Sequence, residues 1–407
     1  MRIMYIHQYF KSPAEGGAVR SYHLAKGLVD AGHEVELITG SQEKSYDQRW
    51  IDGIKVHFLP VEYNQRFSFL KRIKAFLSYV SQSKRLIKKL RRADLLYITS
   101  TPLTTGLLGL WAKKKLAIPY IFEVRDLWPK APIEVGIIRN PIVKRFLIAL
   151  EKKIYRNALS IVALSPGIAR HIRGVAPERT VHLIPNFSDL DVFYPKEKDE
   201  QKLLDYGLQK TFTIAYTGAL GRVNAVDELV LFAELAQDRQ KNWQFLIMGE
   251  GSQEQSLKDL AKSKKLKNTF FIPFGSKERV NEVLACADLA WISFAPFPVL
   301  KTNSPNKFFD AIAAGKAVIV NHKGWVYELM KTHHLGLACL PGKIQTAFSK
   351  IEELEKDSER LSQMGKNSRL IAEKFFTKEQ AIQKLIQVIQ PHNGDDTSGH
   401  DMLILTA

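Results

Sequence analysis

Several residues that could bind a ligand or take part in a reaction lie at the start of one helix-like segment, NSPNKFFDAIAAGKAVIV, which runs from Asn303 to Val320. Ser304 can cap a helix, and Pro305 suits its first position. The next amides would then point toward phosphate oxygens, and they belong to Asn306, Lys307 and Phe308. Lys307 would add a mobile positive charge, and Asp310 could accept hydrogen bonds from vicinal hydroxyls. A capped core helix with an acid placed to suit its dipole explains the same residues equally well.

A second group follows a predicted strand in YTGALGRVNAVDEL, which runs from Tyr216 to Leu229. Gly218 permits close approach to the backbone, Arg222 supplies forked donors, and a helix begins near Asn224. Together these features predict a cradle for a diphosphate. A dinucleotide fingerprint would need a third glycine and a ribose-binding acid at the end of the next strand. That strand ends in MGEGS instead, so a nicotinamide cofactor is disfavoured.

Two loops in the first half of the chain carry further candidates. Gly16 and Gly17 precede a helix-like segment, where they let a ligand approach the backbone or simply form a tight turn. The stretch FEVRDLWPK places Glu123, Arg125 and Asp126 after another predicted strand. Asp126 could hold a substrate hydroxyl or accept its proton. The alternative is that the acids and the arginine form an ion pair that only fixes the loop.

Short apolar runs that alternate with longer helix-like segments must position all these loops. The pattern predicts the α/β class, with parallel sheets covered by helices. One series of strands runs from RIMYIHQY to VHLIPN, and a second runs from FTIAYTG to LGLACL. Such sheets bind ligands at the carboxyl ends of their strands. We therefore expect two Rossmann-like domains that face each other across a cleft.

The polar segment between the two series contains a proline and a charge run, which predicts an interdomain linker. The expected limits are an N-terminal domain over residues 1–188, a linker over 189–210 and a C-terminal domain over 211–365. Two helices are expected to close the fold, over residues 344–364 and 366–390. The polar tail, residues 391–407, is expected to be disordered.

A net charge of +17 over 407 residues indicates an anionic partner. No acid occurs over residues 66–92, where apolar residues fall at helical spacing among lysines and arginines. Such a basic amphipathic helix suits an anionic membrane surface. Packing of its apolar stripe on its own domain is an equal alternative. No helix-turn-helix, zinc or RNA-binding signature accompanies the charge, so nucleic acid is not an expected partner.

The cysteines and the apolar runs indicate the compartment. Cys286 and Cys339 lie in apolar runs and cannot build a disulfide scaffold or a zinc site. The first residues lack the long apolar stretch of a signal peptide, and the longest apolar run is interrupted by lysines at 113–115. We expect a cytoplasmic protein, peripheral on the inner face of the cytoplasmic membrane. No cluster has metal-ligand spacing, so neither a metal nor a cofactor is expected.

Taken together, the motifs resemble those of the retaining glycosyltransferases of family 4, which have the GT-B architecture of two facing Rossmann-like domains. The resemblance covers nearly the whole chain and rests most specifically on SPNKFFDAIAAGKAVI. Further support comes from AYTGALGRVNAVDEL, IMGEG, FEVRDLWP and IVALSPGI. The wording EVRDLWP with NSPNKFFD is most similar to the branch that transfers N-acetyl-L-fucosamine in bacterial O-antigen and capsule assembly.

By position, the resemblance implies a role for each candidate residue. Gly16 and Gly17 would approach a nucleotide-sugar donor, and Asp310 would hold its ribose hydroxyls. The residues expected to meet the diphosphate are Gly218, Arg222, Ser304, Asn306, Lys307 and Phe308. The N-terminal domain would bind the acceptor, and the helix over residues 366–390 would cross back onto that domain.

Three positions depart from the family pattern. The pair of glutamates eight positions apart becomes Thr302 and Asp310. The lysine that often follows the arginine of the diphosphate loop is replaced by uncharged residues at 224–226, and Lys307 could compensate. The histidine that often precedes the loop aspartate is Arg125. Asp126 or the donor itself must then accept the acceptor's proton, so Arg125 and Asp126 are the candidate catalytic residues.

The resemblance thus implies a metal-independent hexosyltransferase that retains configuration. It would move an N-acetylated 6-deoxyhexosamine or hexosamine from a UDP-sugar to a polyprenyl-diphosphate-linked saccharide, in bacterial surface polysaccharide biosynthesis. Two alternatives stay open. One is a UDP-sugar 2-epimerase, and the other is a non-catalytic subunit that binds a nucleotide sugar.

Overall fold

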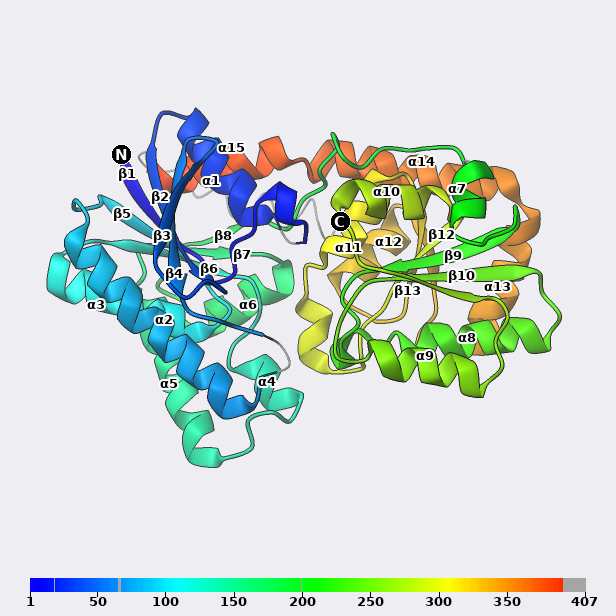
Figure 1. Cartoon of the computed structure of the whole chain (residues 1–407), viewed down its shortest axis with the longest axis horizontal. Coiled ribbons are helices and arrows are strands. Elements are labelled where there is room, and N and C mark those ends of the chain that lie inside the picture. Colours follow the sequence, from blue (N-terminus) through cyan, green and yellow to red (C-terminus); the bar gives the residue numbers. More distant parts are fainter. Residues whose placement is uncertain (18, 65–66, 199, 391–407) are drawn as a thin grey trace.

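The computed structural model describes residues 1–17, 19–64, 67–198 and 200–390. Two α/β domains lie side by side, and the last described helix lies over the first domain (Figure 1). This arrangement confirms the expected α/β class with two Rossmann-like sheets. The tail that we expect to be disordered, residues 391–407, lies outside the described residues, as does Arg66 of the predicted basic helix.

The first domain is built on an eight-stranded sheet in the order β3-β4-β2-β1-β5-β6-β7-β8. Neighbouring strands run parallel except β3, which is antiparallel to β4. The strands are β1 (Arg2–Ile6), β2 (Glu34–Ser41), β3 (Asp47–Ile51), β4 (Ile54–Pro60), β5 (Leu95–Thr99), β6 (Tyr120–Val124), β7 (Ile161–Ala163) and β8 (Val181–Leu183). Most of them are continuous apolar runs, because helices cover both faces of the sheet.

The helices of the first domain begin where the sequence provides capping residues. Asn140 accepts hydrogen bonds from the first amides of α5, Ser165 does the same for α6, and a proline follows each cap. The helices are α1 (Arg20–Asp30), α2 (Phe69–Lys89), α3 (Gly106–Leu116), α4 (Lys130–Glu134), α5 (Pro141–Asn157) and α6 (Pro166–Val175), with short 3-10 turns η1 (Pro13–Glu15) and η2 (Leu103–Thr105).

The second domain has a six-stranded parallel sheet in the order β11-β10-β9-β12-β13-β14. Its strands are β9 (Phe212–Thr217), β10 (Trp243–Met248), β11 (Thr269–Ile272), β12 (Leu289–Ile292), β13 (Ala317–Val320) and β14 (Gly336–Ala338). Its helices are α7 (Glu200–Asp205), α8 (Asp227–Asp238), α9 (Glu254–Ser263), α10 (Lys277–Ala285), α11 (Asn306–Ala313), α12 (Trp325–Thr332), α13 (Ile344–Lys356) and α14 (Ser358–Phe375), with 3-10 turns η3 (Arg222–Asn224) and η4 (Pro298–Thr302). Phe232, Trp243 and Phe348 pack ring to ring in its core.

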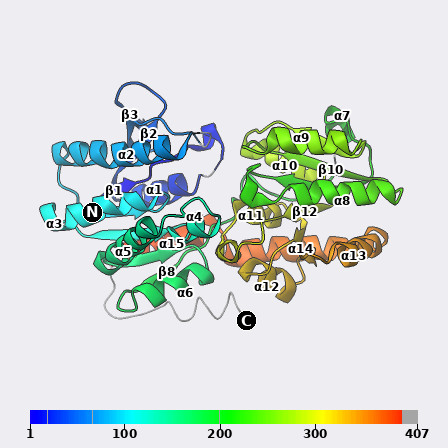
Figure 2. The same ribbon diagram turned by 90° about the horizontal axis from the view of Figure 1, so that it is seen from below.

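The last helix, α15 (Lys378–Ile389), packs on α1 of the first domain, whereas α14 stays with the second (Figure 2). Gly27 makes this packing possible, because a Cβ at that position would lie only 2.4 Å from Ile382 Cγ2. The crossing of the C-terminal helix back to the first domain is therefore confirmed. Among the described residues, no helix is long and apolar enough to cross a membrane.

The expected helix boundaries near the C-terminus are wrong. The two helices predicted over 344–364 and 366–390 are three, α13, α14 and α15. Asp357 caps α14 and Thr377 caps α15, and the buried side chain of Phe376 anchors the break between the last two helices. The mostly exposed edge strand β3 and, inside the predicted linker, the short helix α7 were not expected.

Candidate functional site

The loop between β1 and α1 reaches across to the second domain. Gly16 and Gly17 both have positive φ, at 67° and 83°. A Cβ on Gly16 would lie 3.6 Å from the carbonyl oxygen of Gly275 and 3.8 Å from the ring of Phe274. Gly16 therefore lies against the loop between β11 and α10, where the two domains meet.

The loop after β9 is held by backbone contacts to the loop after β10. The amide of Gly218 donates to Met248 O at 3.0 Å, and the amide of Leu220 donates to Glu250 O at 2.8 Å. A Cβ on Gly249 would lie 1.8 Å from Gly218 O, and one on Gly251 would lie 2.4 Å from Leu220 O. The glycines of MGEGS thus serve the packing of the Gly218 loop, which agrees with our rejection of a dinucleotide fingerprint.

Lys307 is fixed rather than mobile, so that part of our interpretation is wrong. Its Nζ donates to Tyr216 Oη at 3.1 Å, to Asn224 Oδ1 at 3.1 Å and to Ser293 O at 2.9 Å. The same ammonium lies 4.3 Å from the centre of the Phe294 ring. Burial lowers the pKa of Lys307 to about 7. An anion bound beside this amine would favour its charged form.

Lys307 reaches the loop in which the family pattern often has a lysine. Its Cδ lies 3.8 Å from the position that a Cβ on Gly218 would take. Asn224, one of the uncharged residues in place of that lysine, accepts a hydrogen bond from the Lys307 ammonium. Arg222 lies in the same loop, in η3, with an exposed side chain. The structure therefore brings Lys307 to the Gly218 turn and leaves Arg222 exposed on the same loop.

The start of α11 differs from the predicted capped helix. The helix begins at Asn306, Pro305 is its N-cap residue, and no side chain caps it. The Ser304 hydroxyl accepts instead from the amide of Asn186 at 3.0 Å, across the domain boundary. The amide of Phe308 already donates to Pro305 O, and its ring is buried in the core. Ser304 and Phe308 thus have structural partners that the sequence did not reveal.

Asp310 lies near the same helix start and pairs with a lysine that we did not single out. Its Oδ2 accepts from Lys277 Nζ at 2.7 Å. Burial raises the pKa of Asp310, the Lys277 ammonium opposes this, and Asp189 adds to the rise. A small cavity between the domains is lined by Asp310, Asn306 and Lys277 from one side and by His23 and Asn186 from the other.

In the loop after β6, Glu123 lies apart from the other two candidates that we grouped with it, Arg125 and Asp126. Glu123 is fully buried and pairs with Arg20, so it does not share a site with its neighbours. Arg125 Nη1 lies 3.1 Å from His7 Nε2, and the Arg125 amide donates to Ser100 Oγ. Burial raises the pKa of Asp126, and the Arg125 guanidinium opposes that rise. Arg125 and Asp126 remain together at the strand end.

His7 and Lys277 are site residues that we missed. Lys277 follows a predicted strand, so the rule of carboxyl strand ends could have found it. His7 was placed inside the predicted strand RIMYIHQY, which in the structure ends at Ile6. Burial lowers the pKa of His7 well below its usual range, and the nearby Arg125 charge lowers it further. The imidazole is therefore neutral, which leaves Nε2 free to accept from Arg125 when the proton is on Nδ1.

Thr302 occupies the position where the family pattern has its first glutamate. Its hydroxyl donates to Val299 O at 2.7 Å, and its backbone carbonyl accepts from Ser165 Oγ. A Cβ on Gly167 in α6 would lie 2.7 Å from Thr302 Cγ2. Thr302 thus faces helix α6 of the first domain and helps join the two halves.

Two family models match the chain, one for each domain. Residues 15–186 match the model described as a glycosyl transferase 4-like domain. Residues 197–371 match the model described as glycosyl transferases group 1. A relative from Haemophilus influenzae, described as an uncharacterized glycosyltransferase, is 25% identical over 177 residues. The match covers 43% of this chain and 47% of that relative, so the chain spans about half the length of the curated protein it matches.

Solved structures with the same fold cover nearly the whole chain. Sucrose-phosphate synthase from Thermosynechococcus elongatus is 18% identical, with a TM-score of 0.78 over 95% of this chain and 98% of its own. HepE from Anabaena, in complex with UDP-glucose, is 17% identical, with a TM-score of 0.72 over 96% of this chain and 99% of its own. At these identities the likeness concerns the fold.

The lowered pKa of Lys307 predicts a specific pH dependence of stability. The folded-state pKa of about 7 lies below the usual value near 10.5. Between these values the unfolded chain binds more protons, so stability rises with pH. Relative to Lys307→Met, the wild type should gain up to about 1.4 kcal/mol in free energy of unfolding per pH unit between about pH 7.5 and 9.5. Urea unfolding at several pH values measures the difference, and parallel curves for the two proteins would contradict the assignment.

Proposed function

The chain belongs to the family 4 glycosyltransferases and has their GT-B fold, and from this premise we propose that it transfers a sugar from a UDP-sugar to a lipid-linked saccharide with retention of configuration. The observation that carries the proposal is the buried Lys307 ammonium beside the Gly218 turn. A fixed cation at this strand end, with Arg222 on the same loop, suits a diphosphate.

The donor would lie along the carboxyl ends of the second sheet. Arg222, Lys307, the Gly218 turn and the start of α11, including Asn306, would meet the diphosphate, and Gly16 and Gly17 would close over it from the first domain. Asp310 would accept hydrogen bonds from the ribose hydroxyls and share its carboxylate with Lys277. Among possible nucleotides we favour UDP, because the similar HepE structure contains UDP-glucose.

The acceptor hydroxyl would approach the sugar from the face that the diphosphate leaves. The bond between the anomeric carbon and the phosphate oxygen breaks, a bond to the acceptor oxygen forms, and the departing phosphate takes the proton. Arg222 and Lys307 stabilise the charge that develops on that phosphate without requiring a metal. Asp126, with Arg125 oriented by His7, would hold the acceptor hydroxyl at the cleft.

The proposals for the sugar and for the pathway are based on the residues of two sequence motifs. EVRDLWP and NSPNKFFD favour an N-acetylated 6-deoxyhexosamine or hexosamine in bacterial O-antigen or capsule assembly. One observation favours the non-catalytic alternative, because the glutamate of the family pattern is replaced by Thr302, which faces α6. We prefer the transferase, because the fixed cation beside the Gly218 turn is intact.

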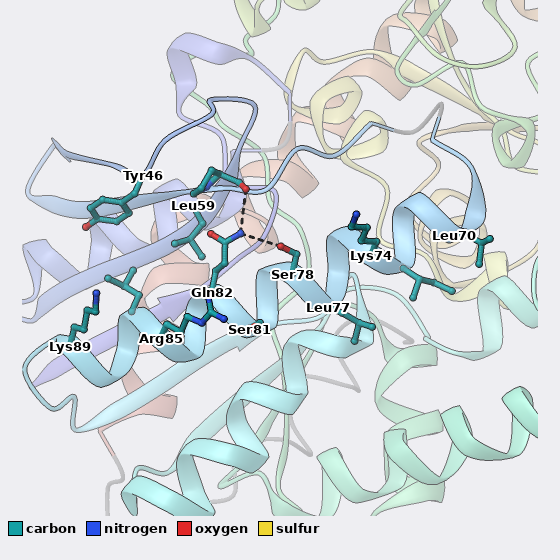
Figure 3. Close-up of a pocket in the computed structure, with 13 residues that line it drawn as sticks. Tyr46, Leu59, Leu70, Lys74, Leu77, Ser78, Ser81, Gln82, Arg85 and Lys89 are labelled. Carbon is teal, nitrogen blue, oxygen red and sulfur yellow. Dashed lines mark hydrogen bonds between the residues drawn. The ribbon is translucent and has the colours of Figure 1, made fainter.

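A membrane surface is the proposed location of the acceptor. The helix α2 carries exposed apolar residues, Leu70 and Leu77, beside basic ones, and α5 exposes Ile142 and Phe146. A groove of about 1060 Å³ lies between α2 and residues Tyr46, Leu59 and Pro60 (Figure 3). Basic residues Lys74, Arg85 and Lys89 line it together with Leu70, Ile73 and Leu77. This combination of charge and apolar surface suits the inner face of an anionic membrane.

Mass spectrometry of transfer products tests the proposed function. The purified protein is incubated with a panel of nucleotide sugars and polyprenyl-diphosphate-linked monosaccharides. We expect one UDP-sugar to add a single sugar residue to one acceptor, with the anomeric configuration of the donor kept. Conversion of the donor to an epimer without acceptor would indicate a 2-epimerase, and UDP binding without any turnover would indicate a non-catalytic subunit.

The assignment of Asp310 to the ribose predicts weaker donor binding in Asp310→Ala. Without the Asp310 carboxylate, the buried ribose diol loses its hydrogen-bond partner, and the free energy of UDP binding should weaken by about 1 to 3 kcal/mol. Calorimetric titration with UDP measures this change. The control is Glu359→Ala, which removes an exposed acid at the start of α14. If the UDP affinity of Asp310→Ala stays within about a factor of two of the wild type and equals that of the control, the ribose lies elsewhere.

Neutralising the basic face of α2 should abolish salt-sensitive binding to anionic vesicles. The variant changes Lys84, Arg85, Lys88 and Lys89 to glutamine. Each charge near the surface contributes about 1 kcal/mol, so sedimentation with phosphatidylglycerol vesicles at low salt should be lost. The matched control neutralises four exposed lysines of the second domain, Lys262, Lys267, Lys331 and Lys366. Equal loss in both variants would indicate only an effect of net charge.

A further inference from the structure

The loop after β1 buries polar groups that lack partners. Gln8 is 2% exposed, and neither its Oε1 nor its Nε2 has a hydrogen-bond partner among the described residues. The Tyr9 hydroxyl is also buried, and it interacts with the hydroxyl of Tyr63. Leaving such groups unpaired costs about 1 to 3 kcal/mol each. Both residues follow the carboxyl end of β1, and Gln8 lies beside Gly40 near the end of β2.

Arg72 presents a charge on the inner face of α2. It precedes Ala75 and Tyr79, which are buried against the sheet, by one and two helical turns. Its Nε is buried without a hydrogen-bond partner, and no ion pair involves Arg72 within the described part of the chain. Its neighbour Lys71, in contrast, is exposed, pairs with Glu62 at 3.7 Å and lies over the ring of Phe67.

Arg72 lies near Tyr9, because Phe76, one helical turn after Arg72, packs on Tyr63, and the Tyr63 ring packs on Tyr9. Burial raises the pKa of the Tyr9 hydroxyl, Tyr63 and Tyr79 add to the rise, and the positive charge of Arg72 opposes it. The two residues come from segments that the sheet brings together at its cleft edge. A guanidinium and a hydroxyl in this arrangement offer donors to one anionic group.

A run of aromatic rings connects this pair to the candidate catalytic loop. The Tyr9 and Tyr63 ring centres are 4.6 Å apart, those of Tyr63 and Phe76 are 5.7 Å apart, and those of Phe76 and Trp128 are 6.4 Å apart. Trp128 follows Asp126 by two residues. An apolar wall therefore extends from the Arg72 pair to the place where the acceptor hydroxyl would react.

We propose that Arg72 and Tyr9 bind a phosphate of the acceptor's prenyl diphosphate, with the aromatic wall against the adjoining prenyl chain and Gln8 bonded to an acceptor sugar hydroxyl. This inference rests on the proposed function, because it identifies the acceptor subsite of that same cleft. Arg is suited to the role, since its planar fork matches phosphate oxygens. The subsite would position the sugar next to Asp126 and leave the chain free to continue toward the exposed apolar face of α2.

Binding of farnesyl diphosphate to UDP-saturated protein tests the subsite without any transfer reaction. Saturation with UDP keeps the diphosphate out of the donor site, and the short prenyl chain makes a membrane unnecessary. Arg72→Met should weaken binding about tenfold or more, Tyr9→Phe about threefold, and Arg72→Lys by an intermediate factor, because the charge stays and the fork is lost. Lys71→Met removes one charge from the adjacent exposed position and should leave affinity unchanged. UDP affinity should stay the same in all four variants.

Two further ligands distinguish binding of the prenyl chain from binding of the diphosphate. Farnesol should bind much more weakly than farnesyl diphosphate and without dependence on Arg72. Inorganic diphosphate should show the same dependence on Arg72 at lower affinity, because it lacks the chain. Equal affinity for inorganic and farnesyl diphosphate would make this a site for free diphosphate and would overturn the prenyl assignment.

Two results would overturn the proposal altogether. One is equal weakening by Arg72→Met and Lys71→Met, which would mean that only the general charge of α2 matters. The other is unchanged affinity in Arg72→Met. If the wild type transfers no sugar to any acceptor yet binds farnesyl diphosphate through Arg72, the subsite stands and the proposed transferase function fails.

Discussion

The buried ion pair between Arg20 and Glu123 connects the first sheet to the path by which the chain leaves the first domain. Arg20 donates to Glu123 Oε2 through Nε at 3.1 Å and Nη2 at 3.0 Å, and Tyr97 donates to the same oxygen at 2.7 Å. The guanidinium also donates to the carbonyls of Ile184 and Pro185. Removing one partner of such a pair would leave an uncompensated buried charge, which costs about 3 to 5 kcal/mol. The pair therefore defines where the segment after β8 can run.

The position of the proposed donor site follows from that segment. Asn186, next to the anchored carbonyls, donates to the hydroxyl and the carbonyl of Ser304, immediately before α11. Ser188 donates to the carbonyl of Phe309 within α11. The helix that carries Lys307 and Asp310 is thus held from the first domain as well as by its own core. The Arg20–Glu123 ion pair, the segment after β8 and the start of α11 are therefore connected by one continuous series of contacts.

The sequence alone was sufficient for every strand except β3, because apolar runs between helix-like segments leave few other interpretations. It failed at β3, whose residues DQRWI are mostly polar and mostly exposed at a sheet edge. It also failed at Lys307, because the three acceptors that fix this amine come from β9, from η3 and from the end of β12. Glu123 paired with an arginine 103 positions earlier rather than with Arg125 nearby. Such pairings depend on the tertiary arrangement, which local spacing does not contain.

Two passes of the chain cross between the domains at the same place. One is the segment after β8, and the other joins α14 to α15, where the Ser188 amide donates to Phe376 O at 2.7 Å and Ser188 forms a bridge with Thr377. Two segments that are tied at one point resist separation there, so a rotation of the domains about that crossing would disturb the fewest contacts. Opening would then be greatest at the edge of the cleft farthest from it, and the route of entry into the cleft would be set by hinge geometry rather than by a separate lid.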